Sequence, residues 1–396
     1  HRGLCDQTCQ GFVMLGTSAS AGALARPLID HHCHGISPAE LDWTAFQALF
    51  SESYRPPPAG TNEFQKPLGL AIRAFCAPLL DLAPHASGED YVARRLQLGA
   101  AEVNRRLMQA SGLESLLVDT GHRSSTILGY AETGRMAGRP AHEVVRIESV
   151  LEEVAASGVG ATGFAAAFGQ RLAERTAAAV GLKSIVAYRC TFAIDQTPPS
   201  AAALIDAVGA WTKAAEAAGK FRVSDPVVIR HGLWVGAEIC RDRRLPLQLH
   251  VGFGDPDILM HACDPTHFTP FIAAMETWSV PITLLHNWPF MKEAQWLSEV
   301  FENVYYDAGV ILNYGALESE RILREALQIG KFQKFLFSTD AFGLAELYYL
   351  GTYLYRRAMA RIIDGWIAEG LMAAKDADAL ATLIATENAR RIYPGT

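Results

Sequence analysis

Short apolar segments alternate with helical segments along most of the chain, and this alternation limits the fold more than any other feature. Each apolar segment is bounded by Gly, Pro or polar residues, which is typical of a buried strand. Strands separated by helices pair in parallel, because each helix carries the chain back across the sheet. The predicted strands cover residues 29–34, 113–119, 144–148, 182–189, 245–250, 281–286, 303–307 and 335–340.

Eight strand–helix units in a chain of 396 residues predict a (β/α)8 TIM barrel of the α/β class. A Pro-rich and partly helical insertion, residues 36–111, follows the first predicted strand, and a helical tail covers residues 344–393. No linker rich in Gly, Ser or Pro divides the chain. We therefore expect an N-terminal segment, residues 1–25, and a single barrel domain, residues 26–396.

The composition and net charge of the chain limit the kinds of molecule that it is expected to bind. The net charge is −7, and the absence of a basic block argues against nucleic acid. No apolar run reaches the length of about 18 residues that a membrane span requires. Residues 11–25 are only a weak match to a signal peptide, and the seven cysteines lack the spacing of a disulfide framework. We expect a cytoplasmic protein that binds a small-molecule substrate, with a homo-oligomer left open.

Metal-binding side chains end four of the predicted strands. His32 and His34 alternate on the first strand, so they share one face and could grip a divalent metal together. The fifth and sixth predicted strands end in His250 and His286, and the eighth ends in Asp340. Barrel enzymes carry their chemistry at the carboxyl ends of the strands. We therefore predict that these five side chains converge.

Three longer motifs carry a resemblance to a known family. They are Leu28-Ile-Asp-His-His-Cys-His-Gly35, Gln248-Leu-His-Val-Gly-Phe-Gly-Asp-Pro-Asp257 and Ser338-Thr-Asp-Ala-Phe-Gly-Leu-Ala-Glu-Leu-Tyr-Tyr-Leu-Gly351. The chain resembles the amidohydrolase superfamily of metal-dependent hydrolases. Within it, the motifs are most similar to the amidohydrolase-type domain of glutamine-synthetase-fused proteins. The resemblance covers nearly the whole chain from about residue 22.

The resemblance implies metal ligation by His32, His34, His250 and Asp340, with His286 beside the reacting water. Elementary chemistry agrees, because a divalent ion lowers the pKa of a bound water towards ~7. Asp340 could accept the proton of that water and pass it to the leaving amine. His286 could orient the water or donate to the forming oxyanion. The expected cofactor is one Zn²⁺, with Mn²⁺ or Fe²⁺ as alternatives.

Lys183 bears on the number of metal ions. In two-metal members of the superfamily, a carbamylated lysine on the fourth strand bridges both ions. Lys183 lies on the fourth predicted strand, but at its beginning, six residues before Arg189. Since ligands belong at the other end of a strand, we expect Lys183 to reach a carboxylate lower in the barrel, and we favour one metal.

Three further residues are candidates for substrate binding. Arg189 ends the fourth predicted strand and could hold a carboxylate with two hydrogen bonds, or it could pair with a loop acid such as Asp195. Glu148 ends the third predicted strand, and it could either bind the substrate or form an ion pair within the protein. Asp255 follows a loop with two glycines, and it could bind an ammonium group or cap the next helix.

These features favour an enzyme, a metal-dependent amidohydrolase that cleaves a C–N amide bond of a small, carboxylate-bearing substrate. The resemblance adds γ-glutamyl amides as candidate substrates. The alternatives are a non-oxidative decarboxylase, in which Asp340 protonates carbon, and a non-catalytic metal-binding module. Release of CO₂ without an amine would identify the decarboxylase.

Overall fold

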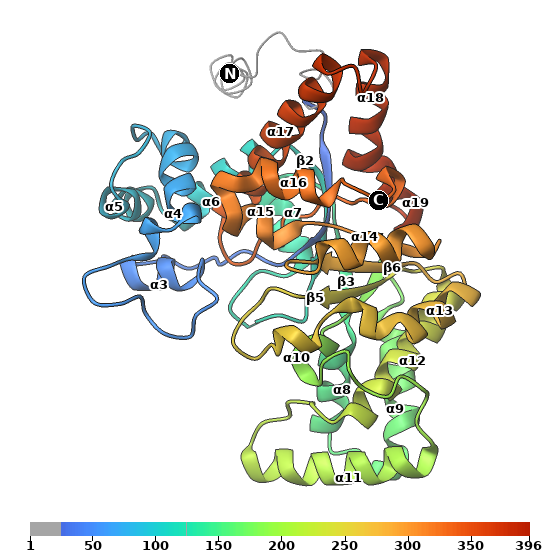
Figure 1. Cartoon of the computed structure of the whole chain (residues 1–396). Coiled ribbons are helices and arrows are strands. Elements are labelled where there is room, and N and C mark those ends of the chain that lie inside the picture. Colours follow the sequence, from blue (N-terminus) through green and yellow to red (C-terminus); the bar gives the residue numbers. More distant parts are fainter. Residues whose placement is uncertain (1–24, 124) are drawn as a thin grey trace.

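The computed structural model describes residues 25–123 and 125–396. Seven parallel strands form one sheet in which every strand pairs with its neighbour in sequence, and helices surround the sheet (Figure 1). The strands are β1 (Leu28–Cys33), β2 (Leu113–Asp119), β3 (Ala141–Arg146), β4 (Gly181–Ser184), β5 (Leu247–Val251), β6 (Ile282–His286) and β7 (Val304–Tyr306).

Residues 335–340 occupy the place of the eighth strand without regular strand geometry. On one side, the Leu336 amide donates to the Tyr306 carbonyl at 2.9 Å. On the other side, the His31 amide donates to the Phe337 carbonyl at 3.1 Å, and the Asp340 amide donates to the His32 carbonyl at 3.0 Å. The segment therefore joins β7 to β1, and the predicted TIM barrel is confirmed.

The predicted ends of the third and fourth strands are wrong. β3 stops at Arg146, and Glu148 lies in helix α8 (Ile147–Ala156). β4 stops at Ser184, and Arg189 lies in the short helix α10 (Val186–Arg189). Both runs stay apolar after the strand ends, and a buried strand and a buried helix have the same apolar signal in sequence.

The insertion lies to one side of the barrel (Figure 1) and contains α3 (Trp43–Ala48), α4 (Pro67–Ala71), α5 (Gly88–Leu98) and α6 (Ala100–Ala110). A buried ion pair joins it to helix α17 (Ala345–Ala368), with Arg95 Nε 2.6 Å from Glu346 Oε1. The Tyr91 hydroxyl donates to the same oxygen at 2.8 Å. These buried polar side chains all have partners, and they anchor the insertion to the barrel.

The remaining helices complete the outer layer: α7 (Tyr130–Ala137), α9 (Ala161–Arg175), α11 (Ala201–Ala218), α12 (Pro226–Arg243), α13 (Thr269–Thr277), α14 (Met291–Val300), α15 (Gly309–Gly315), α16 (Ser319–Ala326), α18 (Ala374–Thr382) and α19 (Asn388–Ile392). Within residues 25–123 and 125–396, every helix falls short of the length or apolarity of a membrane span. The weak signal-peptide match lies outside the described residues except for Ala25.

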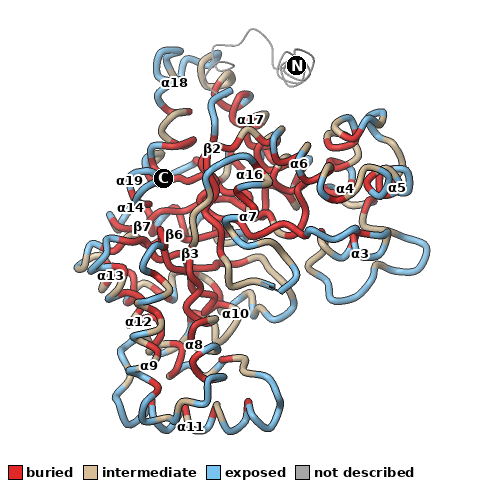
Figure 2. The backbone as a smooth tube through the Cα atoms, turned by 180° about the vertical axis from the view of Figure 1, so that it is seen from behind, coloured by how far each residue is buried: buried red, intermediate tan, exposed pale blue. Residues whose placement is uncertain are grey.

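Buried residues follow the strands and the inner faces of the helices (Figure 2). Ile29, Leu117, Val144 and Leu336 form one apolar cluster with Tyr393, from the C-terminal tail. Each aliphatic side chain in such a cluster stabilises the fold by about 1.5–3 kcal/mol through burial. This apolar layer closes the barrel on the side away from the polar strand ends.

Candidate metal centre

The five metal-binding side chains predicted at strand ends converge in the structure. Asp340 Oδ1 lies 3.0 Å from His32 Nε2 and 3.3 Å from His34 Nε2. Asp340 Oδ2 lies 3.6 Å from His286 Nε2, and the rings of His286 and His250 are 4.6 Å apart between centroids. We call these five side chains the candidate metal centre.

The donor atoms of this centre fit a divalent metal. His250 Nε2 and Asp340 Oδ1 are buried and make no hydrogen bond. Ligand atoms of His32, His286 and Asp340 all lie within 4.8 Å of one another. Buried polar atoms without partners are costly, and a shared cation would satisfy several of them at once. Neutral imidazoles with a carboxylate are a common donor set for Zn²⁺ and related ions.

The electrostatics keep these groups in their metal-binding forms. Burial lowers the pKa of His32 to about 3 and the pKa of His286 to about 4, so both rings are neutral near pH 7. Burial acts to raise the pKa of Asp340, but the neighbouring imidazoles of His286, His32 and His34 hold it well below its usual range. The carboxylate is therefore ionised at neutral pH.

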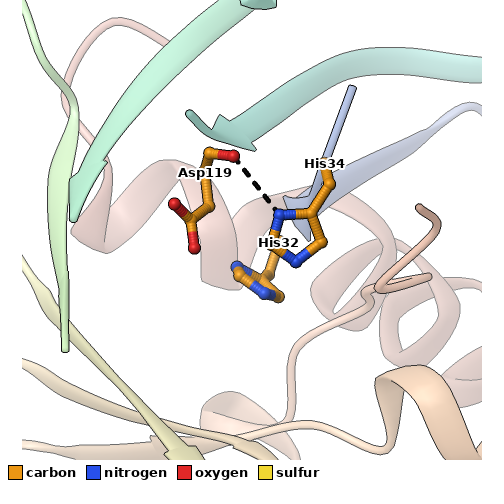
Figure 3. Close-up of side chains that lie close together, drawn as sticks. All are labelled: His32, His34 and Asp119. Atoms are coloured by element: carbon orange, nitrogen blue, oxygen red, sulfur yellow. Dashed lines mark hydrogen bonds between the residues drawn. The ribbon is translucent and has the colours of Figure 1, made fainter. Parts of the chain in front are cut away.

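Asp119 at the end of β2 also faces this centre, and it was not among the predicted metal ligands. Its backbone carbonyl lies 3.3 Å from His34 Nδ1 (Figure 3). Ligand atoms of Asp119, His32 and His34 all lie within 4.8 Å of one another, so these three side chains could also hold a metal ion. The Asp119 carboxylate accepts a hydrogen bond from Arg146 Nη2 at 2.5 Å. The signal was present in the sequence, because the second predicted strand also ends in a carboxylate.

Lys183 lies at the candidate metal centre, so its predicted place lower in the barrel is wrong. Its Nζ is 3.4 Å from His32 Nε2, and the side chain is only 1% exposed. Because β4 ends at Ser184, Lys183 stands at the carboxyl end of the strand. Burial lowers the pKa of Lys183 to about 8, which leaves part of the amine unprotonated near neutral pH. A single metal stays a prediction.

A cavity of about 510 Å³ opens above the candidate metal centre. Its walls come from the insertion and from the loops that follow the strands. Besides the metal centre, the lining includes Glu52, Tyr54, Arg123, Tyr188, Arg189, Phe253, Asp255, Tyr314 and Phe342. A cavity of this size, with several charged groups, suits a small polar substrate.

The three predicted substrate-binding residues have different surroundings. Arg189 lines the cavity, but its Nη1 lies 3.0 Å from Glu152 Oε1 and not beside Asp195. Asp255 lines the cavity and also accepts a hydrogen bond from the Asp257 amide at 2.9 Å. Glu148 does not line it, and its carboxylate accepts hydrogen bonds from the Ser184 hydroxyl and the Ile185 amide instead. Glu148 thus supports the turn between β4 and α10.

Arg123 and Glu52 are charged residues of the cavity that no sequence motif predicted. Arg123, in the loop after β2, lies with its guanidinium carbon 5.3 Å from the centre of the Phe342 ring. Glu52 comes from the insertion and accepts a hydrogen bond from the Tyr314 hydroxyl at 2.8 Å. Neither belongs to a motif, and only the fold of the long insertion and of the loops brings these side chains to the cavity.

A TIM barrel with histidines and an aspartate gathered at its carboxyl end has the arrangement of a metal-dependent hydrolase. A comparison of sequences agrees, because the profile of the family described as amidohydrolase matches residues 29–395. The chain belongs to the amidohydrolase family, and its family and donor set together imply a divalent metal.

Several known proteins are similar to the chain. Protein FluG from Emericella nidulans is 30% identical over 224 residues, which are 54% of this chain and 26% of that protein. The crystal structure of a candidate metal-dependent hydrolase from Lactobacillus casei has a TM-score of 0.82 and 23% identity, covering 94% of this chain and 96% of that one. A uronate isomerase from Bacillus halodurans has a TM-score of 0.64 and 12% identity, with 94% of both chains covered. The two structural likenesses show the fold.

Proposed function

We propose that the protein is a metal-dependent hydrolase that cleaves a C–N amide bond in a small, carboxylate-bearing substrate. The observation that carries this proposal is the position of Asp340, whose two oxygens face His32, His34 and His286. A divalent ion in this centre would supply Lewis acidity, which activates water as a nucleophile near neutral pH.

The protein's own side chains would handle the protons and the charge of the substrate. Asp340 is ionised, so it can accept a proton from the attacking water and deliver it to the leaving nitrogen. His286 stands beside the second oxygen of Asp340, where it can orient the carbonyl group under attack.

We propose that Arg123, rather than Arg189, binds the substrate carboxylate. Glu152 lies 3.0 Å from Arg189 and offsets its charge. No acidic side chain in residues 25–123 and 125–396 forms an ion pair with Arg123. Asp255 and Glu52 line the same cavity and could hold an ammonium group. This charge pattern suits a γ-glutamyl amide, which has both groups.

Two other activities and a non-catalytic role would also fit a barrel of this kind, and an analysis of the reaction products separates them. A decarboxylase releases CO₂ without an amine, and an isomerase of the uronate type releases neither. A non-catalytic module binds metal and converts none of the compounds in a broad panel of candidate substrates. A C–N hydrolase releases ammonia or an amine together with a carboxylic acid.

The test is to load the protein with Zn²⁺, Mn²⁺ or Fe²⁺ and to incubate it with γ-glutamyl amides, other N-acyl amides, aromatic acids and uronates. We expect amine release from substrates that bear a carboxylate, and none from their methyl esters. Arg123→Gln should raise KM for these substrates, whereas the matched change Arg105→Gln, at an exposed site on α6, should not. Product formation without amine release would contradict the proposal.

A further inference from the structure

Tyr393 follows helix α19 near the C-terminus, and its side chain is buried inside the barrel. The hydroxyl oxygen lies 2.9 Å from Gln248 Nε2 and 2.9 Å from His31 Nδ1. His31 is 362 residues away in the sequence and immediately precedes a predicted metal ligand. The C-terminal tail therefore places a polar atom beneath the candidate metal centre.

Gln248 connects this hydroxyl group to His32. The Gln248 Oε1 atom lies 2.8 Å from His32 Nδ1, and Gln248 Nε2 lies 2.8 Å from the backbone carbonyl of His31. A carbonyl oxygen can only accept a hydrogen bond, so the amide nitrogen of Gln248 must face it. The amide oxygen must then face His32, and the two ends of the amide cannot be exchanged.

This fixed amide determines where the proton of His32 sits. The amide oxygen only accepts, so His32 Nδ1 must carry the hydrogen. The lone pair is then on Nε2, which lies 3.0 Å from Asp340 Oδ1. Both of these atoms are then hydrogen-bond acceptors, and a cation bound between them would remove the repulsion of their lone pairs. The tautomer that Gln248 selects is therefore the one that can bind a metal from the side of the cavity.

The hydrogen bonds continue in one direction beyond Gln248. Tyr393 accepts the second amide hydrogen of Gln248, and His31 Nδ1 can accept the hydroxyl proton of Tyr393. His31 Nε2 then donates to Asp307 Oδ2 at 2.8 Å, and Asp307 Oδ1 accepts the backbone amide of His286 at 2.7 Å. In such a chain, each hydrogen bond polarises the next.

We propose that Tyr393 is a positioning residue for the metal ligand His32 and acts through Gln248. This inference rests on the proposed metal centre. Without the hydroxyl group, one amide hydrogen of Gln248 is buried without an acceptor, and the amide no longer holds the His32 ring in a single orientation. Partners of metal-binding histidines alter metal affinity by about 10–100-fold, and we expect about tenfold weaker binding for Tyr393→Phe.

Tyr306→Phe provides a matched control. Tyr306 is also fully buried, and its hydroxyl donates to the Ala326 carbonyl of α16 at 2.8 Å, away from this chain of hydrogen bonds. Zn²⁺ affinity is measured by competition with a chromogenic chelator, and the visible spectrum of the Co²⁺-loaded protein reports the ligand field. We expect Tyr393→Phe to bind about tenfold more weakly and to shift the spectrum, and Tyr306→Phe to match the wild type. Wild-type affinity and spectrum in Tyr393→Phe would overturn the role of Tyr393.

A measurement on the wild-type protein keeps the inference testable if Tyr393→Phe does not fold. Nitrogen-15 NMR of the histidine rings should show His32 with its proton on Nδ1 in the metal-free protein, with His32→Gln used for assignment. A proton on Nε2 would overturn the inference. A wild-type protein that binds none of the divalent ions would overturn the proposed function as well, whereas tight binding unaffected by Tyr393→Phe overturns this inference alone.

Discussion

Lys183 Nζ lies 3.4 Å from His32 Nε2, so a buried amine stands directly beside a predicted metal ligand. Two roles are compatible with this position. The amine could bind substrate or water next to one ion, or it could be carbamylated and bridge two. The ratio of metal to protein separates these roles, because only the second requires Lys183 to hold an ion.

With one metal, Lys183→Met should keep a ratio of about one ion per chain while kcat falls by at least tenfold, because the variant loses only the amine. The ratio is measured by elemental analysis of dialysed protein, and thermal denaturation checks folding. A wild-type ratio of about two that falls in Lys183→Met would contradict the one-metal prediction.

Asp340→Asn should abolish most of the turnover while the metal is largely retained. The amide keeps an oxygen for the metal but cannot accept a proton, and loss of a general base typically costs about 10²–10⁴-fold in rate. Steady-state kinetics and metal analysis on the same sample check this. Normal turnover in Asp340→Asn would exclude Asp340 as the base.

Arg95→Met should destabilise the fold by about 3–5 kcal/mol, because it leaves the Glu346 carboxylate buried without its cation. Urea denaturation measures the change in the free energy of unfolding. Arg105→Met provides the control, since the Arg105–Glu102 pair lies on the surface and should contribute less than about 1 kcal/mol. Equal effects of the two changes would show that the Arg95–Glu346 pair does not anchor the insertion.

Glu52→Gln should stabilise the protein at pH 7 and leave its stability unchanged at low pH. Burial raises the pKa of Glu52 in the folded protein, so the free energy of unfolding falls as the pH rises above the pKa of the unfolded chain, and the loss is complete above the folded pKa. Below the pKa of the unfolded chain, about 4.3, the carboxyl is protonated in both states and the difference disappears. Urea midpoints at pH 7 and pH 3.5 check the sign, and a loss of stability at pH 7 would contradict it.

Much of the candidate site could be predicted because a parallel barrel collects all its strand ends on one face. Finding His32, His250 and Asp340 at the ends of apolar runs was therefore enough to bring them together. The predictions that the third strand ends at Glu148 and the fourth at Arg189 were wrong for a different reason. The chain stays apolar where it turns from strand to helix, and that turn depends on hydrogen bonds to the Glu148 carboxylate from Ser184 and Ile185.

The sequence by itself determined the barrel, its family and the predicted ligands of the metal centre, since periodicity and motifs are local properties of the chain. Only the tertiary structure decided which side chains surround those ligands. Glu52 reaches the cavity through the packing of the insertion, and Tyr393 reaches Gln248 from the far end of the chain. Contacts between residues so distant in sequence depend on how the helices pack around the barrel, and no local pattern encodes them.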